Sequence, residues 1–197
     1  MSRRLVLASR SPARLKTLRA AGLDPVVTVP DVDETHTEAS SAGEIALELA
    51  HRKAVAVAGT VGDDSLVVGC DSVLELDGQT YGKPGSADQA AARWHRMRGS
   101  RGILHTGHCL VDCATGRVRQ RIASTTVDFA DLDDEEIEAY VATGEPLGVA
   151  GAFTIDGRGG AFVRRIDGDP HTVVGISLPL LREMLAELDV RWTDLWV

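Results

Sequence analysis

The run LVVGC at residues 66–70 constrains the fold more than any other feature of the sequence, because it is continuously apolar. A strand that is exposed on one face alternates polar and apolar residues, whereas an unbroken apolar run is typical of a strand covered on both faces. Asp71 follows this run directly. We therefore predict a helix-covered sheet, with Asp71 at the carboxyl end of a buried strand, where open α/β sheets place ligand-binding groups.

The segments around this strand supply the rest of an α/β fold. Ser11 and Ser86 are suited to cap helices, and Asp77-Gly78 indicates a tight hairpin turn. The turn at 114–116 joins two neighbouring strands, so the sheet should be mixed rather than purely parallel. The predicted strands are 4–8, 66–70, 73–76, 79–81, 103–112, 117–129 and 161–166, and the predicted helices are 12–22, 42–58, 87–97, 133–144 and 178–188.

The net charge excludes one broad class of function. The chain has 197 residues, of which 44% are apolar and 25% charged, so it can fold by itself as one domain spanning residues 1–197. Its formal charge of −8 argues against a general nucleic-acid binder, which needs clustered Lys and Arg. A small anionic substrate needs only a local group of cations, and a bound metal can supply part of the charge.

The sequence also favours a cytoplasmic protein that does not enter a membrane. No apolar run approaches the roughly 20 residues that span a bilayer. The apolar segment in the opening MSRRLVLAS is too short for a signal peptide. The three cysteines, Cys70, Cys109 and Cys113, fit reduced thiols better than a disulfide framework.

The first candidate site is the turn between the opening strand and its helix. Ser9, Ser11 and Arg14 lie where backbone N–H groups, hydroxyls and a guanidinium can meet one phosphate. A capped helix with a surface arginine explains the same residues equally well.

Two further candidates are single charged residues next to apolar segments. Lys53 falls on the apolar stripe of the helix at 42–58, so its ammonium must either reach water along the surface or meet an anion in a cleft. Asp71 could hold a metal or take a proton from water, although an Asp can also cap the next turn. We favour a functional Asp71 because the preceding run is so apolar.

Weaker candidates lie in two turns. Asp33 and Glu34 offer oxygen ligands for Mg²⁺ or Mn²⁺, but a solvated acidic loop is the usual explanation of such a pair. Lys83, held between Gly82 and Pro84, suits a phosphate contact or a plain exposed turn.

A zinc site among His105, His108, Cys109 and Cys113 is disfavoured. On a strand, residues 105, 109 and 113 face one side and 108 the other, and the segment has no C-x₂-C pair. We interpret Cys109 and Cys113 as core thiols.

Taken in order, these segments resemble the Maf family, the septum-formation-inhibitor-like proteins, over nearly the whole chain. The matching segments are ASRSPARLKTL, VDET, LAHRKA, GCDSVLELDGQTYGKP and GEPLGVAGAFTIDGRGGAFVRRIDGDPHTVVGISLPL. The resemblance implies an elongated α/β fold shared with inosine-triphosphate pyrophosphatases, with two lobes around a central cleft. It also implies a homodimer that hydrolyses a nucleoside triphosphate to the monophosphate and diphosphate.

The resemblance assigns roles to residues that were already candidates and adds Asp156 to them. It makes Asp71, Lys53 and Lys83 catalytic, and Glu34 and Asp71 the ligands of a divalent cation, Mg²⁺ or Mn²⁺. The substrate-binding set that it implies is Ser9, Ser11, Arg14, Lys53, Lys83 and Asp156.

The chain departs from the family pattern at four positions. Ala13 replaces the first arginine of a pair, Gly148 and Val149 replace an Asp-Lys pair, and Asp156 stands where Gln is common. These departures leave open the base preference and the level of activity, and the sequence does not fix whether a normal or modified nucleotide is the substrate. The alternative function is a nucleotide-binding regulator of cell division with little or no catalysis. A phosphatase with Asp71 as nucleophile is set aside, because Val73 stands where that class has a second Asp.

Overall fold

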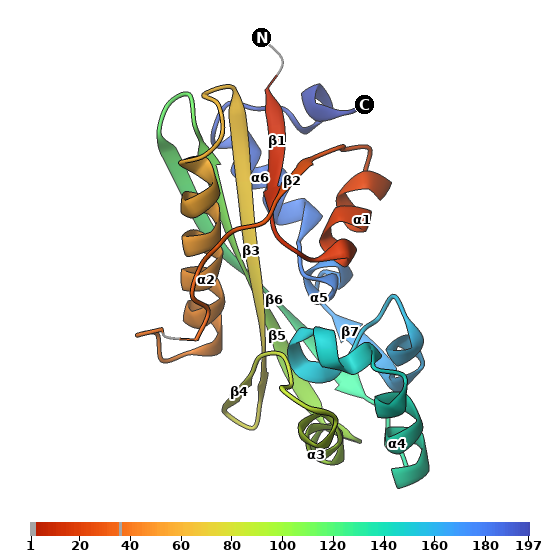
Figure 1. Ribbon diagram of the computed structural model, residues 1–197. Coiled ribbons are helices and arrows are strands. Elements are labelled where there is room, and N and C mark those ends of the chain that lie inside the picture. Colours follow the sequence, from red (N-terminus) through yellow and green to blue (C-terminus); the bar gives the residue numbers. More distant parts are fainter. Residues whose placement is uncertain (1–2, 36) are drawn as a thin grey trace.

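The computed structural model describes residues 3–35 and 37–197 and shows an α/β fold built on one sheet (Figure 1). The sheet order is β2-β1-β3-β5-β6-β7, with β4 paired to β3. Its strands are β1 (Arg4–Ala8), β2 (Val26–Thr28), β3 (Ser65–Leu76), β4 (Gln79–Tyr81), β5 (Arg101–Asp112), β6 (Arg117–Phe129) and β7 (Val163–Asp167). The α-helices are α1 (Pro12–Ala20), α2 (Ala42–Ala58), α3 (Ala87–Met97), α4 (Asp134–Ala142), α5 (Pro170–Val174) and α6 (Leu178–Ala186).

The sheet is mixed, as predicted. Strand β1 runs parallel to β2 and β3, whereas β3, β5, β6 and β7 pair antiparallel in turn. Figure 1 shows the long strands β3, β5 and β6 running most of the length of the molecule, with α1, α2 and α6 toward one end and α3 and α4 at the other. The elongated, helix-flanked α/β sheet is therefore confirmed, while the division into two lobes around a cleft stays a prediction.

The apolar run at the start of β3 is covered on both faces because successive side chains enter different cores. Val67 packs in the cluster under α2, and Val68 in the cluster formed with α1 and α6. Gly69 and Gly107 let α2 approach closely: a Cβ at these positions would lie 2.4 Å from the Ala50 carbonyl oxygen and 2.3 Å from that of Ala46. This contact fixes the height of α2 above the sheet.

The prediction that the strand ends at Asp71 is wrong. Strand β3 continues to Leu76, so Asp71 and Ser72 lie in its middle, still paired with Gly107 and Thr106 of β5. Two adjacent polar residues suggested a strand end, but here each meets a polar partner on its own face of the sheet. The strand therefore has no reason to stop.

The remaining elements follow the predictions closely. Ser11 and Ser86 cap α1 and α3, and Asp133 with Glu136 forms a capping box on α4. At the hairpin turn, Asp77 and Gly78 have φ values of 51° and 71°, as a type I′ turn requires.

Three short features differ from the sequence interpretation. Strand β2 and helix α5 were not predicted, and β7 begins at Val163 because residues 158–162 form a 3₁₀-helix. Cys109 is buried as expected, whereas Cys113 is only half-buried because it lies beyond the end of β5. Among the described helices, none combines the length and apolar character needed to cross a bilayer.

Candidate functional site

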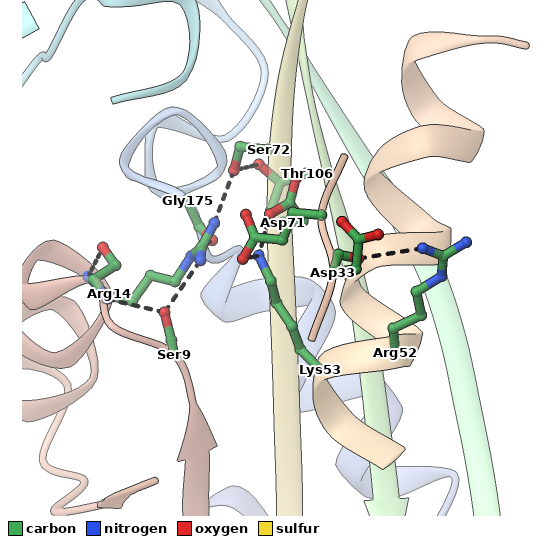
Figure 2. Close-up of polar contacts among 11 residues, drawn as sticks. Ser9, Arg14, Asp33, Arg52, Lys53, Asp71, Ser72, Thr106 and Gly175 are labelled. Carbon is green, nitrogen blue, oxygen red and sulfur yellow. Dashed lines mark hydrogen bonds and ion pairs between the residues drawn. The ribbon is translucent and has the colours of Figure 1, made fainter. Parts of the chain in front are cut away.

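A cation and two carboxylates meet above the middle of β3. Lys53, on α2, places its Nζ 2.5 Å from Asp71 Oδ1 and 3.0 Å from Glu34 Oε1 (Figure 2 shows Lys53 and Asp71). The Lys53 side chain is only 7% exposed, so the apolar stripe does not lead it to water. Of the two interpretations of Lys53, the structure therefore supports the one in which the ammonium meets an anion.

The charges of two further cations, Lys83 and Arg14, affect the pKa of Glu34. Burial on its own would raise the pKa of Glu34, but the hydrogen bond and charge of Lys53 outweigh it, and the charges of Lys83 and Arg14 add to the lowering. The net pKa of Glu34 is lowered. Lys83 and Arg14 are therefore close enough for their charges to act on the Lys53, Asp71 and Glu34 cluster.

Arg14 lies on the other face of β3 and is held by three neutral oxygens (Figure 2). Its Nε donates to the Gly175 carbonyl at 2.7 Å, Nη1 to Ser9 Oγ at 3.2 Å and Nη2 to Ser72 Oγ at 3.2 Å. Ser9 follows the end of β1 and is 4% exposed. Arg14, in the first turn of α1, therefore places its guanidinium against the middle of β3.

Ser9 and Ser11 organise the turn that leads into α1. Ser9 Oγ accepts a hydrogen bond from the backbone N–H of Ser11 at 3.1 Å, and Ser11 Oγ accepts from that of Arg14 at 3.4 Å. Ser11 thus has the capping role that the sequence suggested, and Ser9 contacts the Arg14 side chain directly.

Three residues of this region were missed in the sequence. Ser72 contacts Thr106 at 2.9 Å, and Thr106 donates to the Thr172 carbonyl at 2.9 Å. Gly175 presents its carbonyl to Arg14, 161 residues away along the chain. A hydroxyl within a strand and a glycine after a short helix give no local signal of such contacts.

The loop of Lys83 is tied to the segment that departs from the family pattern. The Gly82 carbonyl accepts from the backbone N–H of Gly151 at 3.1 Å and from Arg93 Nη1 at 2.6 Å. Gly148 and Val149 lie just before Gly151. These two residues, where the resemblance implies an Asp-Lys pair, therefore belong to the segment that is bonded to the loop of Lys83.

Asp156 reaches the helix that carries Arg14. Its Oδ2 lies 3.8 Å from Lys16 Nζ, and both side chains are exposed. A surface pair of this kind adds little stability. It brings the loop at 153–157 next to α1.

His105 and His108 have structural partners outside the cluster. His108 is fully buried: it contacts the Thr106 carbonyl through Nδ1 at 3.0 Å and accepts the Ser177 N–H on Nε2 at 2.8 Å. His105 contacts Glu75 at 3.1 Å and Ser124 at 2.8 Å. Across residues 3–35 and 37–197, no three His, Cys, Asp or Glu side chains come together as metal ligands.

Two hollows of the surface lie away from these residues. One is lined by Arg3, Asp112 and Arg117 near the C-terminus, and the other by Glu38, Glu48 and His51 on the outer side of α2. Both are lined by acidic as well as basic groups. The candidate site is therefore assigned from its contacts and charges, which bring three cations, Arg14, Lys53 and Lys83, to two carboxylates, Asp71 and Glu34.

Several known proteins resemble the chain over nearly its whole length. A nucleoside triphosphate pyrophosphatase of Salinispora tropica is 60% identical over 98% of this chain and 87% of its own length, and one of Streptomyces avermitilis is 56% identical over 98% and 95%. One of Gloeothece citriformis is 47% identical over 97% of each. The Ham1 protein of Staphylococcus aureus, a solved structure, is 18% identical with a TM-score of 0.45, over 66% of this chain and 73% of that one.

The family model described as "Maf-like protein" matches residues 4–188. This range includes all the residues of the candidate site. The chain therefore belongs to the Maf-like protein family.

Proposed function

We propose that the chain is a nucleoside triphosphate pyrophosphatase, which releases a nucleoside monophosphate and diphosphate. The observation that carries this proposal is the contact of Lys53 with both Asp71 and Glu34, within the fields of Arg14 and Lys83. A triphosphate needs several cations to offset its charge, and its hydrolysis needs a group that accepts a proton from water. Relatives that are 56% to 60% identical bear the name of this activity.

In the proposed reaction the cations hold the phosphate chain. Ser9, Arg14, Lys53 and Lys83 bind phosphate oxygens, and Asp71 takes a proton from a water molecule that attacks the α-phosphorus. A bond forms between the water oxygen and phosphorus, and the bond from phosphorus to the oxygen that bridges the α- and β-phosphates breaks. Lys53, bonded to Asp71, holds that carboxylate in place while the diphosphate leaves with the electron pair.

A divalent cation, Mg²⁺ or Mn²⁺, fits the donor set. Glu34 and Asp71 supply hard oxygen ligands and already converge on one positive charge, the Lys53 ammonium. Mg²⁺ usually binds one or two carboxylates together with substrate phosphates, so two protein ligands suffice. When bound, the ion would polarise phosphate oxygens and offset charge on the leaving diphosphate.

The finer properties are also proposals. We expect a cytoplasmic homodimer that acts on free nucleotides, normal or modified, and not on nucleic acids or membranes. The charge of −8 disfavours a polyanionic partner. Light scattering of the purified chain over a concentration series would test the dimer.

The test is release of diphosphate and monophosphate from a panel of normal and modified triphosphates, with Mg²⁺, with Mn²⁺ and with chelator. Hydrolysis in ¹⁸O-labelled water locates the attack, because the label enters the monophosphate only if water attacks the α-phosphorus. Asp71→Asn should lower kcat by roughly 10³-fold or more, since the proton acceptor is lost. Glu75→Gln is a matched control, because Glu75 lies on the same face of β3, four residues away.

Each outcome decides a separate point. Label in the diphosphate would move the attack to another phosphorus, and equal rates in Asp71→Asn and Glu75→Gln would remove Asp71 from the reaction. If the protein binds triphosphates tightly but hydrolyses none of them, the result would instead support a nucleotide-binding regulator.

A further inference from the structure

The Arg14 socket, formed by the Ser9 hydroxyl, the Ser72 hydroxyl and the Gly175 carbonyl, is unusual because all three partners are neutral. Within the described residues, Arg14 forms no ion pair with a carboxylate at 4 Å or less. Its positive charge is therefore oriented by the protein without a directly bonded carboxylate, unlike that of Lys53. An arginine fixed in this way is suited to an incoming anion.

The hydrogen bonds that link Arg14, Ser72 and Thr106 end at the carbonyl of Thr172, and this acceptor determines which group donates in each bond. Thr106 must donate its only hydroxyl proton to the Thr172 carbonyl, because a carbonyl can only accept. Ser72 must then donate to Thr106, which leaves the Ser72 oxygen as an acceptor toward Arg14. The fully buried Thr106 thus sets the polarity of the whole chain of bonds.

The Gly175 side of the socket is also fixed from β5. Thr106 binds the Thr172 carbonyl, and His108, two residues along the same strand, accepts the Ser177 N–H. Residues 172–177 are therefore attached to the sheet at both ends. Gly175 itself has φ of 111°, and a Cβ there would lie 3.0 Å from Arg14 Nε, so a larger residue would displace the guanidinium.

We propose that Ser72, Thr106 and Gly175 are positioning residues that orient Arg14 for the phosphate chain of the substrate. A guanidinium has five N–H groups, and the socket takes three, one from each nitrogen. One N–H on each Nη stays available to donate to the oxygens of an incoming phosphate. The inference rests on the proposed function only for the identity of the anion.

The experiment compares Thr106→Val with Thr125→Val. Thr125 is a matched control, because it is also buried and donates to a backbone carbonyl at the other end of the α5 segment, that of Asp169 at 3.0 Å. Both variants lose one buried hydroxyl and should lose comparable thermal stability. Only Thr106 is linked through Ser72 to Arg14.

We expect Thr106→Val to raise KM for the triphosphate roughly tenfold with kcat changed less, since Arg14 binds the phosphate chain before and during the reaction. Ser72→Ala, which removes the acceptor itself, should act in the same direction, and Thr106→Ser should restore KM because it keeps the hydroxyl. Binding of a non-hydrolysable α,β-methylene triphosphate, measured by calorimetry, should weaken by the same factor.

The results separate failure of the socket from failure of the proposed function. Equal KM and equal analogue affinity in Thr106→Val and Thr125→Val, with an active wild type, would overturn the socket alone. A wild type that binds the analogue but hydrolyses nothing would overturn the proposed enzyme, while the calorimetric comparison would still decide the role of Thr106.

Discussion

Charged groups have different partners on the two faces of β3, at the adjacent residues Asp71 and Ser72. On the α2 face, Asp71 joins Lys53 and Glu34 in a cluster whose charges compensate one another at 2.5 and 3.0 Å. On the other face, Ser72 helps to hold Arg14 with neutral oxygens alone. Asp71 and Ser72 are adjacent in the strand, and because side chains alternate, they point to opposite faces of the sheet.

This difference suggests a division of labour. A compensated cluster can exchange partners when a phosphate or a divalent cation arrives, because Lys53 can shift its bonds from carboxylate to phosphate. An arginine held by neutral partners keeps these hydrogen bonds when the ligand arrives, so it binds the ligand in one fixed position. The α2 face should therefore influence mainly the chemical step, and the opposite face mainly substrate binding.

The largest expected effect comes from breaking the compensated cluster. Lys53→Met leaves Asp71 and Glu34 without their shared cation, and we expect kcat/KM to fall by roughly 10³-fold, mostly in kcat. The pKa of Glu34 should rise, because the bond to Lys53 is the largest effect lowering it. Steady-state kinetics over pH 4 to 9 would measure both changes.

Arg52→Met is the control for that variant. Arg52 is the preceding residue of α2 and contacts Glu48 and the Asp33 carbonyl, so it touches the same acidic loop without contacting Asp71. A comparable loss of kcat in Arg52→Met would mean that Lys53 acts by anchoring the loop, and the comparison of the two faces would fail.

The second effect is a pH dependence of stability that comes from His108, which holds the Ser177 end of the segment that carries Gly175. Burial lowers the pKa of His108 from 6.5 to about 4. Between these values the unfolded chain binds a proton on this ring and the folded chain does not, so stability is full above the unfolded pKa and falls as the pH decreases toward 4. The loss of unfolding free energy should reach about 3 kcal/mol.

Urea unfolding at several pH values would measure it, with His108→Gln as the reference. Glutamine can accept the Ser177 N–H but does not titrate, so the decline attributable to His108 should disappear from the variant. Parallel declines in wild type and His108→Gln would show that the carboxylates alone are responsible.

Much of this architecture could be predicted because its signals are local. The apolar run of β3, the capping residues of α1, α3 and α4 and the Asp77-Gly78 turn each depend on a few neighbouring residues. Lys53 could be singled out because a charge on an apolar stripe is conspicuous. Its contacts with Asp71 and Glu34 were not predicted, since those residues lie 18 and 19 positions away in sequence.

The rest depends on contacts between distant segments. Ser72, Thr106 and Gly175 are ordinary residues of a strand or turn, and they gain meaning only when the sheet and α5 bring them to Arg14. Helix α5 has five residues, too few for a helical period to show, and β2 has three. The strand end expected at Asp71 failed for a related reason, because the polar partners that let β3 continue lie on other elements.

The third prediction separates the charge of Arg14 from its geometry. Arg14→Lys keeps the positive charge but replaces the planar guanidinium, whose three nitrogens each bond one socket oxygen, with one ammonium nitrogen on a flexible stem, so it loses the fixed orientation. We expect KM to rise roughly tenfold, with kcat within about threefold of the wild type. A drop in kcat with unchanged KM, measured by steady-state kinetics, would place Arg14 with the chemical cluster and contradict the division of labour.

The smallest effect tests whether neutral partners alone are enough to identify a binding group. Glu145 is, like Arg14, a charge held by neutral groups: it accepts from the Tyr140 and Thr154 hydroxyls and from the backbone N–H groups of Arg158 and Gly159. These four bonds use the capacity of a carboxylate, whereas Arg14 keeps two donors unused. Saturation should therefore make Glu145 structural.

Burial opposes the effect, but these hydrogen bonds lower the pKa of Glu145 from 4.5 to about 2. Its contribution to stability is therefore present above pH 4.5 and is lost as the pH falls toward 2. Glu145→Gln should cost about 1 kcal/mol of unfolding free energy at neutral pH, a value reduced by solvent screening, and should leave KM within about twofold. Urea unfolding and steady-state kinetics on the same preparation would measure both. A KM rise as large as that of Arg14→Lys would mean that unused donors do not distinguish a ligand-binding charge from a structural one.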